Sequence, residues 1–513
     1  MTNTERYEGA KMLGLLSDYL SDHKGEFVSR TVIGLFQQAS RWYPDKDAVC
    51  LDSTHITYST LDRSSDQLAH YLTEYEHVGP GDIVAVVTGR NMDTPAIVLG
   101  IWKTGAAYMI LDRCCPESHN KNCIRSVNAR ICIDHDYFIN AISSCSQCSA
   151  FEDRSRSHQL ALVLFTSGST GKPKGVRILH SNLAASVSNF DCLPLRSDDT
   201  FASFAKLLFI AAVYDFCSCL SLGCTFRMVP SSICKNIQEL AAFYIQNKIT
   251  VTFLPPHMAT KYIEIDQGST LRLLLVGSEV TRNLKKRPYE IVNIYASSEA
   301  IAAISHYNIQ DARSSYPIGK LVPALKGYVM TEDGTPASIG QNGELWISGA
   351  QICDGYLNLP EVNMDRFAPN PFETAPPFQR VFKTCDIVRI LPDGNMEYIG
   401  RKDNMFKIRG FRVEPSGVER YMLEFPHISE ACVTCFTDNG GTNILFGYFI
   451  ADERIDHRAL RAFLQERIPY YTIPTGFIQT DTFPRTLSGK VDRHGFLPPP
   501  ELDDHKKLAV LYY

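Results

Sequence analysis

Hydrophobic and polar residues follow two different periods along the chain, and these predict both helices and strands. In residues 31–42 and 61–71, apolar residues recur every three or four positions, as on one face of a helix. Residues 47–57 alternate instead, in the manner of two strands joined by a turn. Residues 1–30 are polar and predict no more than a helical lead-in.

A strand–helix–strand unit follows these first elements. Residues 82–88 and 105–112 are apolar runs typical of buried strands, and residues 93–103 between them have the period of a helix. A unit of this kind predicts a parallel sheet in an α/β domain. Residues 113–158 are polar and rich in cysteine, and we expect them to be irregular and mobile.

The most distinctive segment of the chain is residues 164–176. An apolar run, residues 160–165, predicts the buried strand that leads into it, and residues 180–189 predict a helix behind it. The ten residues from Thr166 carry three glycines, four hydroxyl side chains and two lysines. Glycines let backbone N–H groups approach an anion, while hydroxyls and lysines bind its charge, so a polyphosphate site is predicted. The glycines are too close together for a Walker loop, and a flexible surface turn is the plain alternative.

The α/β rhythm continues through residues 199–305. Apolar strands are predicted at residues 250–254, 271–276 and 291–295. The last two run into the polar strings 277–279 and 296–299. Because ligands of parallel sheets collect at the carboxyl ends of strands, both strings are placed where a nucleotide can lie.

The C-terminal part of the chain has a different pattern. From about residue 314 it is rich in predicted strands, and residues 400–412 are dense in charge. A small αβ unit follows, with helices at 416–423 and 456–465 and strands at 430–436 and 442–450. We therefore expect two domains, residues 1–402 and residues 403–513.

Composition excludes several classes of protein. A net charge of −5 makes nucleic acid a poor partner. No run of about 20 apolar residues predicts a membrane span, and the N-terminus lacks the layout of a signal peptide. The 16 cysteines are scattered, and the lone pair Cys145 and Cys148 has no second pair for zinc. We expect reduced thiols and a cytoplasmic location.

Nine motifs occur in the order known for one family. They lie at residues 56–61, 102–112, 164–176, 295–299, 343–349, 382–386, 400–414, 468–474 and 484–493. Through them, the chain from about residue 31 to 495 resembles the adenylate-forming superfamily, and most closely the adenylation domains of nonribosomal peptide synthetases. The resemblance implies an α/β fold: a large N-terminal domain of α/β subdomains with a β-barrel-like subdomain, and a small mobile α+β C-terminal domain.

The resemblance also implies a two-step reaction. A carboxylate attacks the α-phosphate of Mg-ATP to give an acyl-adenylate, and the phosphopantetheine thiol of a carrier protein then takes the acyl group. ATP, Mg²⁺ and that phosphopantetheine are the implied cofactors; a small carboxylic acid and the carrier protein, in trans or within a larger synthetase, are the implied partners. Between the steps the small domain is expected to rotate about Asp403, and Gly410 is expected to line the path of the thiol.

Roles at the nucleotide follow from the same resemblance. Glu299 is expected to bind Mg²⁺, and Lys490 to stabilise the charge that develops between carboxylate and α-phosphate. The remaining expected ATP contacts are Thr166, Ser167, Gly168, Ser169, Thr170, Gly171 and Lys174 at the phosphates, Gly277, Ser278 and Tyr295 at the adenine, and Asp386 and Arg401 at the ribose. Two departures from the family pattern are modest: Ala296 and Ser297 stand where Gly and Pro are usual, and Cys385 replaces a Gly.

A third departure concerns the acid. Members that activate amino acids begin the acid pocket with Phe-Asp, whose Asp pairs with the α-ammonium, but here that pair falls on Phe209 and Ile210. An ammonium buried against Ile210 would be an unpaired charge. The other expected pocket residues, nearly all apolar, are Ala211, Tyr214, Phe253, Leu274, Val276, Ile294, Ala302 and Ala303. We expect a mostly apolar acid: an aryl, aryl- or alkyl-alkanoic, keto, hydroxy or amino-aryl acid.

Three alternatives stay open. One is an acyl- or aryl-CoA ligase of the same superfamily, for which no decisive basic patch is evident. A second is an amino-acid-activating domain in which an acidic side chain from elsewhere contacts the amino group. The third is a catalytically silent relative, although Lys174, Glu299, Asp386 and Lys490 are all present.

Overall fold

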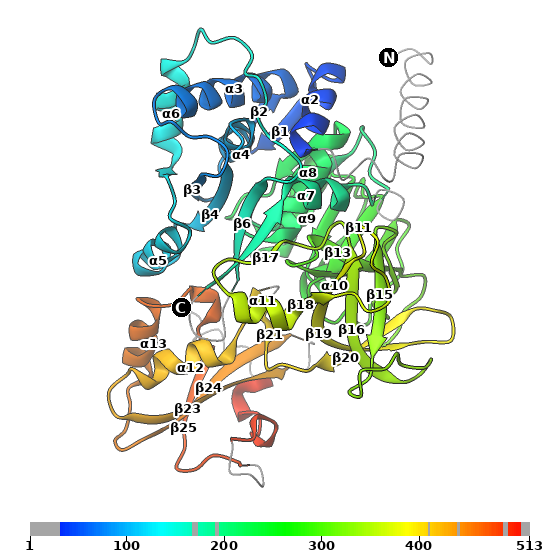
Figure 1. Ribbon diagram of the computed structural model, residues 1–513. Helices are drawn as coiled ribbons and strands as arrows, with labels where there is room; N and C mark the ends of the chain where they lie inside the picture. The colour runs from blue at the N-terminus through cyan, green and yellow to red at the C-terminus, as the bar shows by residue number, and fades with distance from the viewer. Residues whose placement is uncertain are drawn as a thin grey trace.

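The described residues form five sheets: three large ones, a two-stranded hairpin and a three-stranded sheet near the C-terminus (Figure 1). This computed structural model describes residues 31–166, 173–189, 194–408, 411–438, 442–485 and 491–503. In Figure 1 the N-terminal elements lie at the top and the C-terminal elements form a separate lobe at the bottom. The predicted architecture, a large α/β part followed by a small α+β part, is the one observed.

The first sheet has the order β17-β7-β6-β4-β3-β5. Its strands are β3 (Ile83–Thr88), β4 (Ala107–Asp112), β5 (Ile131–Ile133), β6 (Leu160–Thr166), β7 (Lys174–Leu179) and β17 (Gly355–Tyr356). The helices that accompany it are α4 (Thr94–Lys103), α5 (Glu117–Val127) and α6 (His135–Ser144). The predicted strand–helix–strand unit is β3–α4–β4, and its two strands pair in parallel as expected.

Two predictions in this region were wrong. Residues 113–158 are not irregular, because they contain α5, β5 and α6. Each of these two helices buries only two apolar side chains, so their sequences look polar throughout. Strand β7 was missed as well: it pairs antiparallel with β6, so the Gly-rich segment connects the two strands of a hairpin.

The second sheet has the order β14-β13-β12-β11-β10-β8-β9-β1-β2. Its strands are β1 (Asp47–Leu51), β2 (Thr54–Thr57), β8 (Thr200–Ser203), β9 (Thr225–Met228), β10 (Val251–Leu254), β11 (Leu273–Gly277), β12 (Glu290–Ser297), β13 (Ala302–Asn308) and β14 (Lys320–Leu321). The helices of this part are α2 (Val32–Trp42), α3 (Tyr58–Glu74), α7 (His180–Val187), α8 (Ile210–Leu222), α9 (Ile237–Gln246) and α10 (Pro256–Ile265). Strands β10, β11 and β12 run parallel, so their carboxyl ends meet at one edge.

The third sheet and the C-terminal lobe complete the chain. The third sheet joins β15 (Leu325–Met330), β16 (Asn342–Gly349), β18 (Phe367–Pro369), β19 (Arg380–Ile390) and β20 (Met396–Arg401), with α11 (Pro360–Arg366) beside it. A hairpin of β21 (Phe406–Ile408) and β22 (Phe411–Val413) leads into the lobe. The lobe holds α12 (Pro415–Leu423), β23 (Ile428–Thr437), β24 (Asn443–Ala451), α13 (His457–Gln465) and β25 (Gly476–Gln479).

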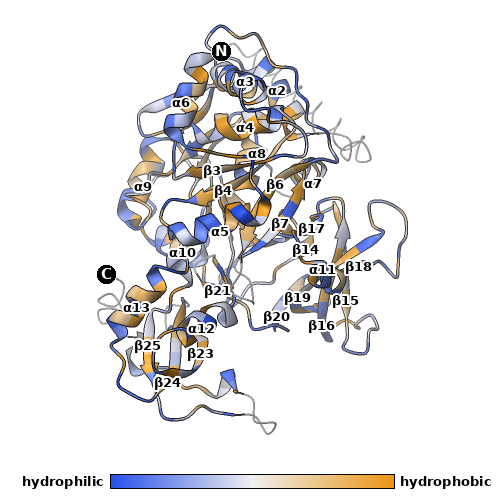
Figure 2. Cartoon of the chain, turned by 60° about the vertical axis from the view of Figure 1, so that its left-hand side comes forward, coloured by the Kyte–Doolittle hydropathy of each residue, from blue (hydrophilic) through white to orange (hydrophobic). Residues whose placement is uncertain are grey.

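Apolar strands line the interior of each part. In Figure 2 the strands β3, β4 and β6 are hydrophobic, whereas α5 at the surface is largely hydrophilic. The largest core cluster joins helices α2, α3, α4 and α8 to the first two sheets, and a separate cluster lies between β23, β24, α12 and α13. The C-terminal lobe therefore has a core of its own, as a separate domain requires.

Gly319 fixes how closely the chain passes strand β13, which carries two residues of the site described below. Its φ is +85°, and a Cβ there would lie 1.8 Å from the carbonyl oxygen of His306. We expect Gly319→Ala to lower the free energy of unfolding by about 3 kcal/mol, because main chain must shift to relieve the clash. Gly334 has a similar φ of +76° with no atom within 4 Å, so Gly334→Ala is the matched control and should cost about 1 kcal/mol. Urea-induced unfolding measures both, and equal losses would contradict the steric argument.

Candidate active site

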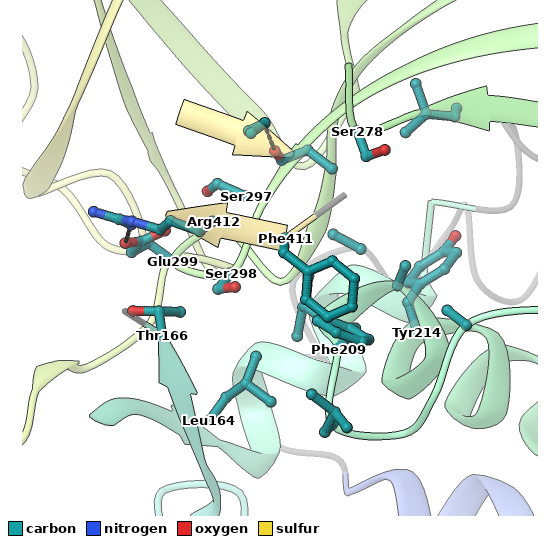
Figure 3. Close-up of a pocket in the computed structure, with 18 of the residues that line it drawn as sticks. Leu164, Thr166, Phe209, Tyr214, Ser278, Ser297, Ser298, Glu299, Phe411 and Arg412 are labelled. Atoms are coloured by element: carbon teal, nitrogen blue, oxygen red, sulfur yellow. Dashed lines mark hydrogen bonds and ion pairs between the residues drawn. The ribbon is translucent and has the colours of Figure 1, made fainter. Parts of the chain in front are cut away.

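A cavity of about 340 Å³ lies where the carboxyl ends of β6, β10, β11 and β12 meet helix α8, strand β19 and the β21–β22 hairpin. The two polar strings predicted to face a ligand, at residues 277–279 and 296–299, both contribute to its wall through Ser278 and residues 296–299. In Figure 3 Glu299 and Arg412 lie at one end of this cavity, Tyr214 lies at the other, and Phe209 and Phe411 lie between them. The cavity therefore has a charged end and an aromatic end.

Glu299 is the buried acid of the charged end. The Arg412 Nη1 donates to its Oε1 at 2.7 Å, and the hydroxyl of Tyr356 donates to the same oxygen at 2.6 Å. Burial alone would raise the pKa of Glu299, but the Arg412 charge and the Tyr356 hydrogen bond outweigh it and lower that pKa to about 2. Glu299 is therefore a carboxylate at any working pH.

Asp386 forms a second buried acidic centre, at β19. Arg401 on β20 donates to its Oδ1 at 2.6 Å through Nη1, and the Tyr295 hydroxyl donates to its Oδ2. The pKa of that hydroxyl is raised well above its usual value, by burial and by the Asp386 charge, so Tyr295 remains a donor. Arg401 also pairs with Asp403 at 2.5 Å through Nε, which ties the end of β20 to the residues that follow.

Tyr295 and Gly277, two of the residues expected to border the adenine, are not among the residues that line this cavity. The Tyr295 ring lies 5.6 Å from the Lys407 Nζ and is buried with its hydroxyl on Asp386. Gly277 sits where β11 passes β12 so closely that a Cβ would lie 2.3 Å from the carbonyl oxygen of Ile294. Ser278 does line the cavity, as predicted, and its buried hydroxyl has no hydrogen-bond partner within the part of the chain that the structure describes.

The β21–β22 hairpin of the C-terminal part enters the charged end. The Lys407 Nζ donates to the carbonyl oxygen of Ala296 at 3.2 Å, and Arg412 forms the pair with Glu299. From β22, Phe411 packs edge-on against Phe209 with ring centroids 4.7 Å apart, and stacks on Tyr471 at 4.2 Å. Two cations and an aromatic ring from this hairpin thus complete the wall.

The predicted acid pocket is largely brought together at the aromatic end. The lining residues that match the prediction are Phe209, Ile210, Ala211, Tyr214, Phe253, Ile294, Ala302 and Ala303. Two predictions were wrong: Leu274 and Val276 point to the opposite face of the sheet, into the cluster with α9 and α10, and Leu275 lines the cavity instead. Side chains alternate along a strand, so an assignment shifted by one residue selects the wrong face.

Several lining residues were missed by sequence reasoning. Lys407, Phe411 and Arg412 line the cavity and belong to residues 400–412, the stretch dense in charged side chains. That density of charge was the available sequence signal for them. Asp215 was passed over because it follows the expected pocket positions by a single residue. Helical spacing was the available signal, because Asp215 shares a face of the helix with the expected pocket residues Ile210, Ala211 and Tyr214.

Seven of the predicted site residues lie outside the described residues: Ser167, Gly168, Ser169, Thr170, Gly171, Gly410 and Lys490. The ends of the Gly-rich segment are described, and Thr166 lies opposite Lys174 in the β6–β7 register. Lys174 lies 3.8 Å from Glu414, and burial lowers its pKa. Val491, next to Lys490, packs against a cluster on the β23–β24 sheet and does not line the cavity.

A second cavity, of about 640 Å³, opens beside the first. It lies between α5, β7, α12 and the 3₁₀ turn Tyr470–Thr472, and it shares Phe165, Thr166 and Tyr471 with the first cavity. Four basic side chains line it: Arg125, Lys174, Arg420 and Arg467. The charged side chains that line this second cavity are therefore mostly basic, with Glu414 as an acid beside Lys174.

Other chemistries find less support. Among the described residues, every cysteine is free, Cys145 and Cys148 included, and no group of three His, Cys, Asp or Glu side chains is placed to hold a metal ion. The helices described by the structure are all too short or too polar to cross a membrane.

Comparisons with known proteins agree with this geometry. The AMP-binding enzyme family matches residues 35–357. The chain is 32% identical over 482 residues to bacitracin synthase 1 of Bacillus licheniformis, covering 91% of this chain and 9% of that protein. It is 29% identical to tyrocidine synthase 2 of Brevibacillus parabrevis, covering 98% of this chain and 14% of that protein. The chain thus spans only a small fraction of the length of these relatives.

Solved structures share the fold. An artificially fused adenylation–PCP di-domain from Klebsiella oxytoca aligns with a TM-score of 0.78 at 23% identity, covering 88% of this chain and 93% of that one. An o-succinylbenzoate CoA synthetase of Bacillus subtilis aligns with a TM-score of 0.77 at 17% identity, covering 93% and 98%. The chain therefore belongs to the AMP-binding enzyme family, and over nearly its whole length it is similar to a small part of synthases such as bacitracin synthase 1 and tyrocidine synthase 2.

Proposed function

We propose that the chain activates a carboxylic acid with ATP as an acyl-adenylate and passes the acyl group to the phosphopantetheine thiol of a carrier protein. The observation that carries the proposal is the two-ended cavity. Its charged end holds Glu299, Asp386 and Arg401, and its other end is an apolar pocket sized for a small acid. A polar site for the nucleotide thus adjoins an apolar site for the acyl group.

The nucleotide contacts follow from that arrangement. Asp386 and Arg401 supply an acceptor and a donor for the ribose hydroxyls, and the unpaired Ser278 hydroxyl is free for the adenine. Thr166 and Lys174, at the two ends of the Gly-rich segment, would contact the β- and γ-phosphates. Lys490 would reach between carboxylate and α-phosphate, as a positive charge placed where negative charge develops.

The residues present fit a magnesium ion at Glu299. Its carboxylate is ionised, and carboxylate oxygen combined with phosphate oxygens is the ligand set that Mg²⁺ prefers. When bound, Mg²⁺ supplies charge neutralisation on the triphosphate. Arg412 and Tyr356 both donate to Oε1 of this carboxylate, and release of Arg412 would make that oxygen available to the metal as well.

The position of the hairpin supports a second step in a second arrangement. With Lys407 and Arg412 in the charged end, the described neighbour of Lys490 lies away from the cavity. We propose residues 1–402 and 403–513 as the two domains, with Asp403 as the hinge and Gly410 beside the thiol path. Asp403 is held by Arg401 here, and breaking that pair would accompany rotation.

The pocket favours an acid substrate without an α-ammonium group, because it has no carboxylate at the position where amino-acid-activating relatives bind that group. Ile210, at the start of α8, lines the cavity where amino-acid-activating relatives place a carboxylate, and its neighbours Ala211, Ala302 and Ala303 are apolar. We expect wild-type protein to catalyse ATP–pyrophosphate exchange with aryl, alkyl, keto, hydroxy or amino-aryl acids at least tenfold faster than with standard α-amino acids.

Ile210→Asp tests whether the absence of a carboxylate at this position excludes α-amino acids from the pocket. The new carboxylate should raise exchange with α-amino acids and lower exchange with their deaminated analogues, shifting the preference by about tenfold or more. Leu208→Asp, a cavity residue just before the α8 N-terminus, is the matched control for adding a charge. Strong exchange by wild type with a standard α-amino acid, and none with its deaminated analogue, would overturn the proposed substrate class.

One observation favours a second candidate, an acyl- or aryl-CoA ligase. The second cavity is lined by Arg125, Arg420 and Arg467, which suit the phosphates of CoA. Incubation of the enzyme with acid, ATP and either CoA or a phosphopantetheinylated carrier protein separates the two. Acyl-CoA formed in preference to loaded carrier would favour the ligase.

A further inference from the structure

Asp215 is an acid in the wall of the apolar pocket. Asp215 lies on α8, one residue after Tyr214, and only 2% of its surface is exposed. Its Oδ2 has no hydrogen-bond partner anywhere in the described part of the chain. Together with Ile210, Ala211 and Tyr214 it forms the face of α8 that lines the cavity, at positions i, i+1, i+4 and i+5 of a helix.

Two basic side chains that line the cavity, Arg90 and Lys206, already bind groups other than Asp215. The Arg90 guanidinium donates to the main-chain oxygen of Ser203 at 3.1 Å, and the Lys206 Nζ pairs with Asp112 at 2.7 Å. Burial therefore raises the pKa of Asp215 well above its usual value, with no neighbouring charge to oppose it. Burial thus favours the neutral form of this carboxyl group more than it would for an exposed aspartate.

A buried carboxyl group without a partner is costly, so such a group in a native protein calls for an explanation. Several residues that line the same cavity, among them Phe253, Leu275 and Ile294, have no side-chain hydrogen-bonding group. A partner for Asp215 can therefore come with the ligand. A primary amine supplies N–H donors and, if charged, a positive charge beside Asp215.

We propose that Asp215 binds an amino group on the acid substrate, set several bonds away from the carboxyl that is activated. The proposal rests on the adenylating function proposed above and specifies its substrate class as an aminoalkyl or amino-aryl acid. Asp215 lies five residues beyond Ile210, or about 7.5 Å along the axis of α8. In Figure 3 the helix runs from Phe209 toward Tyr214, away from Glu299 and Arg412. An α-amino group close to the reacting carboxyl is therefore out of reach of Asp215, whereas a distal amine is in reach.

The test compares acids that differ only in the amine. Binding of 5-aminopentanoate against pentanoate, and of 3-aminobenzoate against benzoate, is measured by calorimetry with the full chain, and pyrophosphate exchange is measured on the same samples. We expect wild type to prefer the amine in at least one pair by about 10- to 100-fold. The first pair reports a charged alkylammonium and the second a neutral arylamine.

Two variants and a control complete the design. Asp215→Asn preserves the shape and Asp215→Leu removes the polarity, and both should bring the preference within about threefold of unity. Ser218→Ala, one turn farther along α8 and also buried, should leave the preference unchanged. A wild type without amine preference in either pair, or an Asp215→Asn protein that keeps it, overturns the proposal. If the Asp215 proposal fails in this way, pyrophosphate exchange with pentanoate or benzoate would still support the adenylating function. If amine binding depends on Asp215 but no acid gives exchange, the adenylating function is overturned and the Asp215 proposal stands.

Discussion

Replacing Glu299 with glutamine is expected to lower the rate of ATP–pyrophosphate exchange by about 100-fold. A carboxamide oxygen is a weaker ligand for Mg²⁺ than a carboxylate, so the ion that neutralises the triphosphate would be held poorly. Exchange measured as a function of Mg²⁺ concentration should show a raised requirement for the metal in addition to the lower rate.

Tyr356→Phe is the matched control for this prediction. It removes the hydrogen bond that the Tyr356 hydroxyl donates to Glu299 at 2.6 Å but keeps the carboxylate. We expect exchange within about tenfold of wild type for this variant. A Glu299→Gln protein with normal exchange at low Mg²⁺ would show that Glu299 is not the metal ligand.

Replacing Arg412 with alanine is expected to separate the two half-reactions. Arg412 holds the β21–β22 hairpin in the charged end through Glu299 and donates to Glu414 at 3.0 Å. Without it the docked arrangement loses a buried ion pair, while Glu299 becomes available to the metal. Transfer of the acyl group to a thiol should fall by about 100-fold, and pyrophosphate exchange should stay within about threefold of wild type.

Hydrogen–deuterium exchange provides a readout of Arg412→Ala that does not depend on turnover. Amides of β21 and β22 should exchange faster when the hairpin docks less often. Arg389→Ala, which removes a half-exposed pair with Glu397 outside the lining of the cavity, is the control and should change neither half-reaction. Equal losses of both half-reactions in Arg412→Ala would contradict a role confined to the docked arrangement.

Much of this fold was predictable because its strands are strongly patterned. The segments that form β3, β4, β10 and β11 are runs of mostly apolar residues, unlike the polar loops around them. The length and the pattern of these runs were enough to assign them as strands. Helix α5 was not predictable in this way, since it buries only Cys123 and Val127 and shows a weak apolar face. Strand β7 was hidden behind the glycines that precede it.

Site residues were predictable from the sequence where a motif calls for a particular side chain. They were less predictable where the direction of a side chain or the packing of distant segments determines which residue lines the cavity. Glu299 and Asp386 were placed by motif, and both are found buried beside cations. The choice between Leu275 and its neighbours depends on which way a strand side chain points, which a run of leucines does not reveal. The contact of Arg412 with Glu299 joins residues 113 positions apart and depends on how the two parts of the chain are arranged.

The central claim, that the cavity forms an acyl-adenylate, is tested most directly by a single-turnover experiment. Excess enzyme is mixed with ATP, Mg²⁺ and a panel of aryl, alkyl and amino-substituted acids, and the bound products are analysed by mass spectrometry. We predict an acyl-adenylate and one equivalent of pyrophosphate with at least one of the acids. Tight binding of ATP without any adenylate from any acid would contradict the account and indicate a catalytically silent relative.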